Sequence, residues 1–178
     1  MNQVKYLAAI LLLVGVQQAQ AAGTLQGTNV ANTASVDYTV GGVNQPDVPS
    51  NASTFLVDRR INLTVAEVGG TSTSVIPGSI DQVTTFTVTN STNGTQDFRL
   101  VGSNDAAGAG TAFSDTDNFD VTSLRVFVDS NGNGTYDPAL DTATFIDELG
   151  ADQTRTVFVL GNIPGGQVNN DTAGVTLR

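Results

Sequence analysis

The stretch QVTTFTVTNSTNGTQDFRL, residues 82–100, contains two runs of alternating apolar and polar residues separated by a short polar segment. Phe86 and Val88 share one face of the first run, and Phe98 and Leu100 share one face of the second. Alternation with a period of two is typical of half-buried strands. Because asparagine and glycine are concentrated in NSTNG between the runs, the stretch predicts a β-hairpin.

The same period recurs on both sides of this stretch. Residues 34–40 place Ala34, Val36, Tyr38 and Val40 on one face, which predicts another half-buried strand. No apolar stripe at helical spacing follows the first 21 residues. The sequence therefore predicts an all-β fold, an antiparallel Greek-key-like β-sandwich of the immunoglobulin-like kind. The remaining strand candidates lie in 54–58, 61–65, 123–129, 142–147, 153–163 and 171–178.

The N-terminus carries the pattern of a secretion signal. Lys5 precedes an apolar run, Leu7–Val16, and Ala19-Gln20-Ala21 provides small residues for cleavage. A retained anchor helix is the alternative, although the run is short for a bilayer. We expect a cleaved signal helix and a bacterial chain that is secreted or on the cell surface. The expected parts are a signal peptide at 1–21, an N-terminal β-strand arm at 22–58 and a β-sandwich domain at 59–178.

The limits of the sandwich domain are less sharply defined than the signal. A soft boundary falls near Asp58-Arg59-Arg60, so the domain is either separate from the arm or continuous with it. The chain ends at Arg178 inside a strand pattern. We therefore expect either a very short last strand or a domain truncated at its C-terminus.

Composition excludes several kinds of chemistry. The chain has no cysteine and no histidine, and Lys5 is its only lysine. Nucleophile–base sets that use cysteine or histidine, imidazole or thiolate zinc sites and lysine Schiff bases are therefore excluded, and we expect no enzyme. The formal net charge is −10. Such acidity disfavours nucleic acid as a partner, because the basic surface that neutralises phosphates is missing.

The segment DSNGNGTYDPALD, Asp129–Asp141, is the strongest candidate site. Side-chain oxygens alternate at its first, third and fifth positions, and glycine stands at the sixth, as in EF-hand calcium loops. The departure lies at the twelfth position, Leu140, so that the closing carboxylate must come from Asp141 one residue later. The predicted calcium ligands are Asp129, Asn131, Asn133, the carbonyl of Thr135, Asp137 and Asp141.

Two other interpretations of acidic and turn residues remain open. The Asn-Gly pairs at 131–134 can turn a hairpin without metal, although a simple turn does not require the carboxylates that follow. Without a bidentate glutamate, a calcium site would have a modest affinity, with a Kd of about 0.1–1 mM. A second cluster, Asp115, Asp117 and Asp120, lacks the alternation and the glycine, and is either a solvated loop or a weaker cation site.

Several motifs together resemble a known kind of domain. They are TTFTVTNSTNGTQDFRL, FVDSNGNGTYDP, TVFVLGNIPGG and DTAGVTL, preceded by NTASVDYTVGG and TFLVDRRINLTV. These resemble conserved-repeat β-sandwich domains of bacterial cell-surface and adhesin-type proteins. The acidic loop resembles the calcium loops of such proteins and, more loosely, those of dockerins and thrombospondin type 3 repeats. The resemblance implies calcium and a non-catalytic extracellular module.

Three functions follow as hypotheses. The first is an exported structural or adhesive surface module whose β-sandwich is stabilised by calcium at the Asp129–Asp141 loop, with calcium, copies of itself or neighbouring surface domains as partners. The second is a fibre subunit that donates the strand at 34–40 to a neighbour's sheet. The third is a secreted carbohydrate-binding domain, for which Tyr136 beside the acidic loop is the obvious aromatic candidate.

Overall fold

The computed structural model describes residues 23–178, in which every regular element is a β-strand in an antiparallel pair. This confirms the prediction of an all-β antiparallel chain for these residues. The predicted signal peptide, residues 1–21, lies outside the described part. Between residues 23 and 178 there is no helix of the length and apolarity that crossing a membrane requires.

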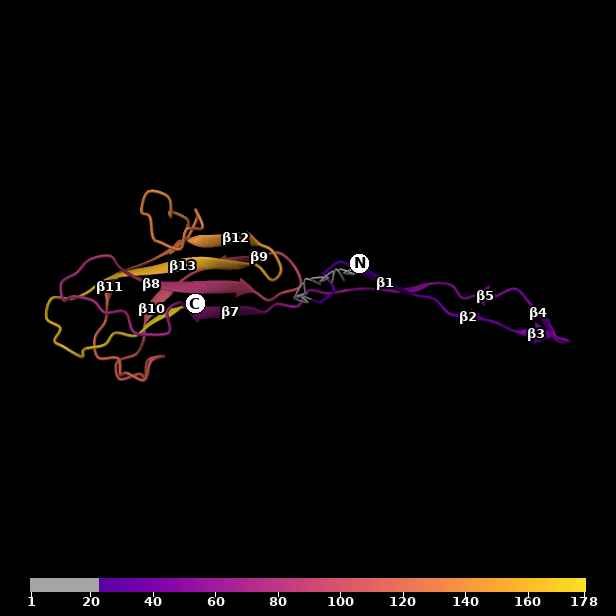
Figure 1. The fold of residues 1–178 in the computed structure, drawn as a ribbon, viewed down its shortest axis with the longest axis horizontal. Helices are drawn as coiled ribbons and strands as arrows, with labels where there is room; N and C mark the ends of the chain where they lie inside the picture. Colours follow the sequence, from indigo (N-terminus) through magenta and orange to yellow (C-terminus); the bar gives the residue numbers. More distant parts are fainter. Residues whose placement is uncertain (1–22) are drawn as a thin grey trace, which may run out of the picture.

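A four-stranded sheet forms the centre of the domain, in the order β11-β13-β8-β7 (Figure 1). The two inner strands, β8 (Gln82–Asn90) and β13 (Thr154–Asn162), pair without interruption from Gln82↔Gly161 to Thr89↔Thr154. The edge strands are β7 (Leu63–Glu67) and β11 (Thr122–Val128). The sequence predicted all three of the strands β8, β11 and β13. Alternation indicated β8 and β11, whereas β13 has a continuous apolar run that is buried on both faces.

Two short ribbons pack against one face of this sheet. One joins β9 (Gln96–Arg99) to β12 (Phe145–Leu149), and the other joins β10 (Gly102–Asn104) to β14 (Val175–Leu177). Side chains from the sheet and the ribbons form one buried cluster, which accounts for the cohesion of the domain. The cluster comprises Phe86, Val88, Val128, Val157 and Val159 from the sheet, and Phe98, Ile146, Leu149 and Leu177 from the ribbons.

The predicted hairpin at residues 82–100 is wrong in its pairing. Both strands exist, but β9 pairs with β12 and not with β8. The reason lies in Asn90, which is fully buried and donates through Nδ2 to the carbonyls of Gly94 (2.9 Å) and Leu149 (2.7 Å). The connection is therefore a buried turn that carries the chain from the sheet to a ribbon.

Residues 29–56 form a long two-stranded arm that projects away from the sheet and its ribbons (Figure 1). The arm turns at Gly41 and Gly42, which have φ of +59° and +81°, as two-residue hairpin turns require. Its strands pair in three successive steps. They are β1 (Asn29–Asn32) with β6 (Ser53–Leu56), β2 (Ser35–Val36) with β5 (Val48–Pro49), and β3 (Thr39–Val40) with β4 (Val43–Asn44).

The prediction of a half-buried strand at residues 34–40 is wrong. This segment contains β2 and β3, and every residue of both strands is exposed. Alternation does place Val36, Tyr38 and Val40 on a common face, but no second layer in the described chain covers that face. The pattern showed which side chains lie together and could not show what packs on them.

The base of the arm is fixed by a single asparagine of the NSTNG turn. Asn93 donates through Nδ2 to the carbonyls of Thr24 (3.1 Å) and Asp58 (2.9 Å), and its Oδ1 accepts from the amide of Arg60 (2.8 Å). Its own carbonyl accepts from the amide of Gln26 (3.0 Å). These four bonds tie both strands at the base of the arm to the turn that follows β8.

Two isoleucines, one buried and one exposed, test which residues stabilise the fold. Ile146 is 2% exposed in the buried cluster, whereas Ile61 is 71% exposed. We expect Ile146→Ala to lower the free energy of unfolding by about 2–5 kcal/mol, because it removes buried methyl groups and leaves a cavity. Ile61→Ala should change it by less than about 0.5 kcal/mol. Urea denaturation followed by circular dichroism measures both, and equal losses would contradict the assignment of the core.

Candidate metal centre

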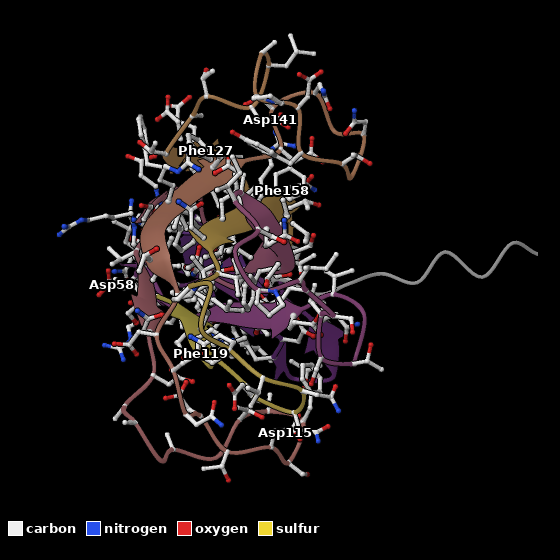
Figure 2. All side chains as sticks on the ribbon, turned by 90° about the vertical axis from the view of Figure 1, so that its left-hand side faces the viewer. Asp58, Asp115, Phe119, Phe127, Asp141 and Phe158 are labelled. Carbon is white, nitrogen blue, oxygen red and sulfur yellow. The ribbon has the colours of Figure 1, made fainter. Side chains whose placement is uncertain are left out.

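The Asp129–Asp141 loop begins directly after β11 and closes on itself. The amide of Val128 donates to the carbonyl of Ala143 (2.8 Å), and the amide of Asp129 donates to Thr156 of the neighbouring strand (3.0 Å). Figure 2 shows the loop projecting from the top of the domain in that view, with Asp141 at its base. The sheet therefore holds both ends of the loop.

Asp129 organises the first half of the loop. Its side chain is buried and accepts three backbone hydrogen bonds, from Gly132 (2.7 Å) and Asn133 (3.3 Å) on Oδ1 and from Gly134 (2.8 Å) on Oδ2. Gly132 and Gly134 have φ of +72° and +75°, in the region that glycine occupies without a steric penalty. The alternation of asparagine and glycine thus wraps the backbone amides around one carboxylate.

The side chains of Asn131 and Asn133 also accept hydrogen bonds from backbone amides of the loop. The Oδ1 atom of Asn131 accepts from the amide of Asn133 (3.0 Å), and the Oδ1 atom of Asn133 accepts from the amide of Thr135 (2.8 Å). These are local turns in which a short side chain bonds to the backbone two residues later. Asn131, Asn133 and Thr135 are all exposed, on the outer part of the loop.

Asp141 closes the loop from its other end. Its side chain is fully buried, its Oδ1 accepts from the amide of Ser130 (2.9 Å), and its Oδ2 accepts from the amide of Asp137 (2.7 Å). The Oδ1 atom of Asp137 accepts from the amide of Ala139 (3.0 Å). The carboxylate one position later than in an EF-hand therefore does bridge the start and the middle of the loop.

The structure brings together only some of the predicted ligands. Asp129 and Asp141 are both buried at the base of the loop, with Asp137 bonded to Asp141, while the predicted ligands Asn131, Asn133 and Thr135 lie farther out. No three acidic side chains in residues 23–178 converge closely enough to define a metal centre by themselves. All the predicted donors are oxygen atoms, a set that suits a hard cation such as Ca²⁺.

The two buried carboxylates at the base of the loop have no cationic side chain beside them. Within residues 23–178 the only ion pair joins Arg125 to Asp81. Neither Asp129 nor Asp141 therefore has a cationic side chain as partner. Backbone amides donate to every oxygen of the two carboxylates, but they supply only partial positive charge. A divalent cation would compensate the remaining negative charge.

Tyr136 anchors the loop to the sheet. Phe127 and Phe158 are register partners on the face of the sheet opposite the buried cluster. The Tyr136 ring stacks on Phe127 (centroids 5.4 Å apart) and meets the edge of Phe158 (5.8 Å). Both rings therefore engage Tyr136 in packing, and no observation favours it as a platform for a sugar.

The second acidic cluster is divided by the fold. Asp115 and Asp120 are exposed, whereas Asp117 is 1% exposed and its Oδ1 accepts from the amide of Gly174 (2.6 Å). The three aspartates therefore do not act as one cage. Their spacing in the sequence gave no sign of this, because the partner of Asp117 is 57 residues away.

Comparisons of the chain with family models, with curated proteins and with solved structures gave no match. The resemblance to conserved-repeat surface domains accordingly stays a prediction that rests on the quoted motifs.

Replacing Asp129 should weaken the loop even without metal. In Asp129→Ala the amides of Gly132, Asn133 and Gly134 lose their common acceptor, and we expect a loss of about 2–3 kcal/mol in the free energy of unfolding in the presence of chelator. Asp147→Ala is the matched control, because Asp147 is exposed on β12. Urea denaturation in chelator measures both variants. No difference between them would show that the carboxylate does not hold the loop.

Proposed function

We propose that the chain is an exported, non-catalytic structural module of a bacterial surface, which associates with other copies through its projecting arm. In this proposal residues 59–178 form an immunoglobulin-like β-sandwich, residues 22–58 form the arm and residues 1–21 a cleaved signal peptide. The observation that carries the proposal is the arm at residues 29–56, in which every strand residue is exposed.

A ribbon of this kind is not expected to be stable in an isolated chain. A two-stranded hairpin without a second layer is marginally stable in water, and its outer edges present unpaired backbone groups. The arm also exposes large apolar side chains, which favours contact with another protein surface. They are Val30, Val36, Tyr38, Val40, Val43, Val48, Phe55 and Leu56.

Composition supports a non-catalytic role. A chain without cysteine or histidine, whose only lysine lies in the predicted signal peptide, lacks the usual nucleophile–base sets. The acidic loop also uses its carboxylates to hold its own backbone, with Asp129 and Asp141 both buried. A structural role for these carboxylates accounts for their contacts better than proton transfer to a substrate does.

Calcium is the second part of the proposal. Asp129, Asp137 and Asp141 would supply carboxylate oxygens, Asn131 and Asn133 amide oxygens, and Thr135 its carbonyl. The support is the pair of buried carboxylates without a cationic side chain. Bound calcium would stabilise the folded chain by mass action, because the unfolded loop does not hold these oxygens together.

A second candidate function, a fibre subunit, is favoured by the position of residues 34–40. These residues contribute to no sheet of the domain and pair only within the arm. Donation of the whole hairpin to a neighbouring copy would use its open edges and its exposed apolar side chains at once. If the acceptor surface differs from the donor surface, such contacts continue from copy to copy and build a filament.

Calcium should raise the melting temperature of the chain. At about 10 mM calcium and a Kd of about 0.5 mM, mass action adds about 2 kcal/mol, which raises Tm by about 4–7 °C over that in chelator. Asp137→Asn retains an acceptor for the amide of Ala139 but loses one ligand charge, so its Tm in chelator should match wild type and its calcium shift should shrink at least by half. Asp147→Asn, a charge change on exposed β12, should keep the full shift. Scanning calorimetry measures these values, and identical shifts in all three proteins would remove calcium from the loop.

Removing the arm should abolish association and leave the domain folded. The amide of Val57 donates to the carbonyl of Thr28 (2.9 Å), so an Asn-Gly turn can replace residues 29–56 between them. We expect this variant to keep the wild-type Tm within about 3 °C and to sediment as a monomer at concentrations where the wild type associates. Assembly that persists without the arm would contradict the proposal.

A point variant pair sharpens this test. Val36 and Val48 are register partners, as are Thr39 and Asn44 in the next part of the same ribbon. Val36→Asp with Val48→Asp should weaken association at least tenfold, whereas Thr39→Asp with Asn44→Asp adds the same charge at polar positions and should weaken it less. Sedimentation velocity separates the two. Equal effects would indicate repulsion between charges instead of lost apolar contact.

A further inference from the structure

One face of the arm at residues 29–56 carries its apolar cross-strand pairs. Residues directly opposite each other in an antiparallel ribbon project from the same face. Each of the three paired steps contains one such apolar pair, and together they are Val30 with Phe55, Val36 with Val48, and Val40 with Val43. On the outgoing strand Val30, Val36 and Val40 are separated by even numbers of positions, so alternation keeps the three pairs on one face.

The returning strand reaches this arrangement through one additional residue between successive steps. Its three apolar members lie five and seven positions apart, odd spacings that would put neighbours on opposite faces of a regular strand. From the step of β1 and β6 to that of β2 and β5 the outgoing strand advances three residues and the returning strand four, and the next step repeats this. Backbone bonds continue between the steps, from the amide of Ser50 to Ala34 (2.7 Å). Each additional residue is a β-bulge that returns the apolar side chain to the common face.

The charges of the arm lie on its other face. Asp37 and Asp47 are the charged residues of positions 29–56. Asp37 follows Val36 and Asp47 precedes Val48, so alternation directs both carboxylates away from the apolar face. Figure 1 shows the arm projecting clear of the sheet and its ribbons, and the apolar side chains are exposed in the single chain. The arm thus presents an uncharged apolar face to a partner.

The domain has a large groove, but its charge does not suit the arm. A cavity of about 1020 Å³ is lined by residues of β7, β8 and β14, among them Val65, Phe86 and Leu177. Every charged side chain that lines it is acidic, and these are Glu67, Asp105, Asp115 and Asp171. The arm has two carboxylates and no basic residue. Docking of the arm in this groove would therefore bring like charges together, which costs free energy.

We propose that the apolar face of the arm packs against the same face of the arm of a second copy. This inference rests on the proposed function, since it names the surface that the arm meets when copies associate. Two uncharged faces meet while Asp37 and Asp47 of each copy point outward, so the contact brings no like charges together. The ribbons then form two layers about 10 Å apart. Each ribbon provides the other with the second layer that a two-stranded hairpin lacks.

A contact of this kind closes on itself. The same surface is used on both copies, so the pair has two-fold symmetry and leaves no further apolar face of the arm for a third copy. Association through the arm therefore ends at a dimer. Docking of the arm on a different surface of the next copy would instead continue from copy to copy.

Mixing chains with and without the arm tests which surface receives it. The variant in which an Asn-Gly turn replaces residues 29–56 retains the domain and its groove but has no arm. In sedimentation velocity we expect the wild type alone to form dimers, and the armless chain, carrying a fluorescent label, to stay monomeric in excess wild type. A complex of the armless chain with the wild type would overturn the inference, because the arm would then dock on the domain, while association through the arm would stand. A wild type that stays monomeric at every attainable concentration would overturn the proposed function as well.

A full-length variant provides the same test should the armless chain fail to fold. Val36→Asp with Val48→Asp puts charge on the apolar face and leaves the domain unchanged. Its labelled form should bind wild type more weakly by about tenfold or more, because its carboxylates would face an apolar surface. Thr39→Asp with Asn44→Asp adds the same charge on the opposite face and should retain more of the binding. Undiminished binding of the Val36→Asp, Val48→Asp chain to wild type would show that its domain receives the wild-type arm, and the inference would be wrong.

Discussion

The uninterrupted pairing of β8 with β13 is the constraint on which the other parts of this molecule depend. One face of the pair, through Val88 and Val157, provides the centre of the buried cluster. The opposite face carries Phe158, on which Tyr136 of the acidic loop rests. The end of β8 leads into the turn that holds the arm. Core, candidate metal loop and arm are thus attached to one pair of strands, whose buried valines shield its hydrogen bonds from water.

The turn after β8 shows how a few polar side chains can set topology. Asn90 is buried and uses both of its amide hydrogens on carbonyls of Gly94 and Leu149, so that the chain crosses to β9 instead of folding back on β8. Asn93 then accepts and donates across the base of the arm. An NSTNG segment read by composition alone is a hairpin turn. Its actual role depends on which backbone groups its side chains reach, and those groups are distant in sequence.

Much of the sheet was predictable from local patterning. Alternation placed Phe86 and Val88 on the core face of β8 and indicated β11 in the same way. The apolar run Val157–Leu160 of β13 does not alternate, because both faces of that strand are buried. The same alternation predicted burial at 34–40, where the structure has an exposed ribbon. Period two encodes a shared face and contains no information about the layer that covers it. The pairing of the strands could not be predicted either, since it is decided by contacts between residues far apart in the sequence.

The two acidic regions differ in how the sequence encodes them. The contacts of the loop after β11 are local, because Asp129 accepts from amides three to five residues later. The spacing of its residues was therefore enough to single out this loop. The contact of Asp117 with Gly174 is non-local, and spacing gave no indication that Asp117 is buried while Asp115 and Asp120 are exposed.

The two regions also differ in how far hydrogen bonds satisfy their buried carboxylates. In the first loop, backbone amides already satisfy the carboxylate oxygens, so a cation would add stability to a loop that forms without it. Oδ2 of Asp117, by contrast, is buried and has no hydrogen-bond donor within residues 23–178, so its burial is unfavourable.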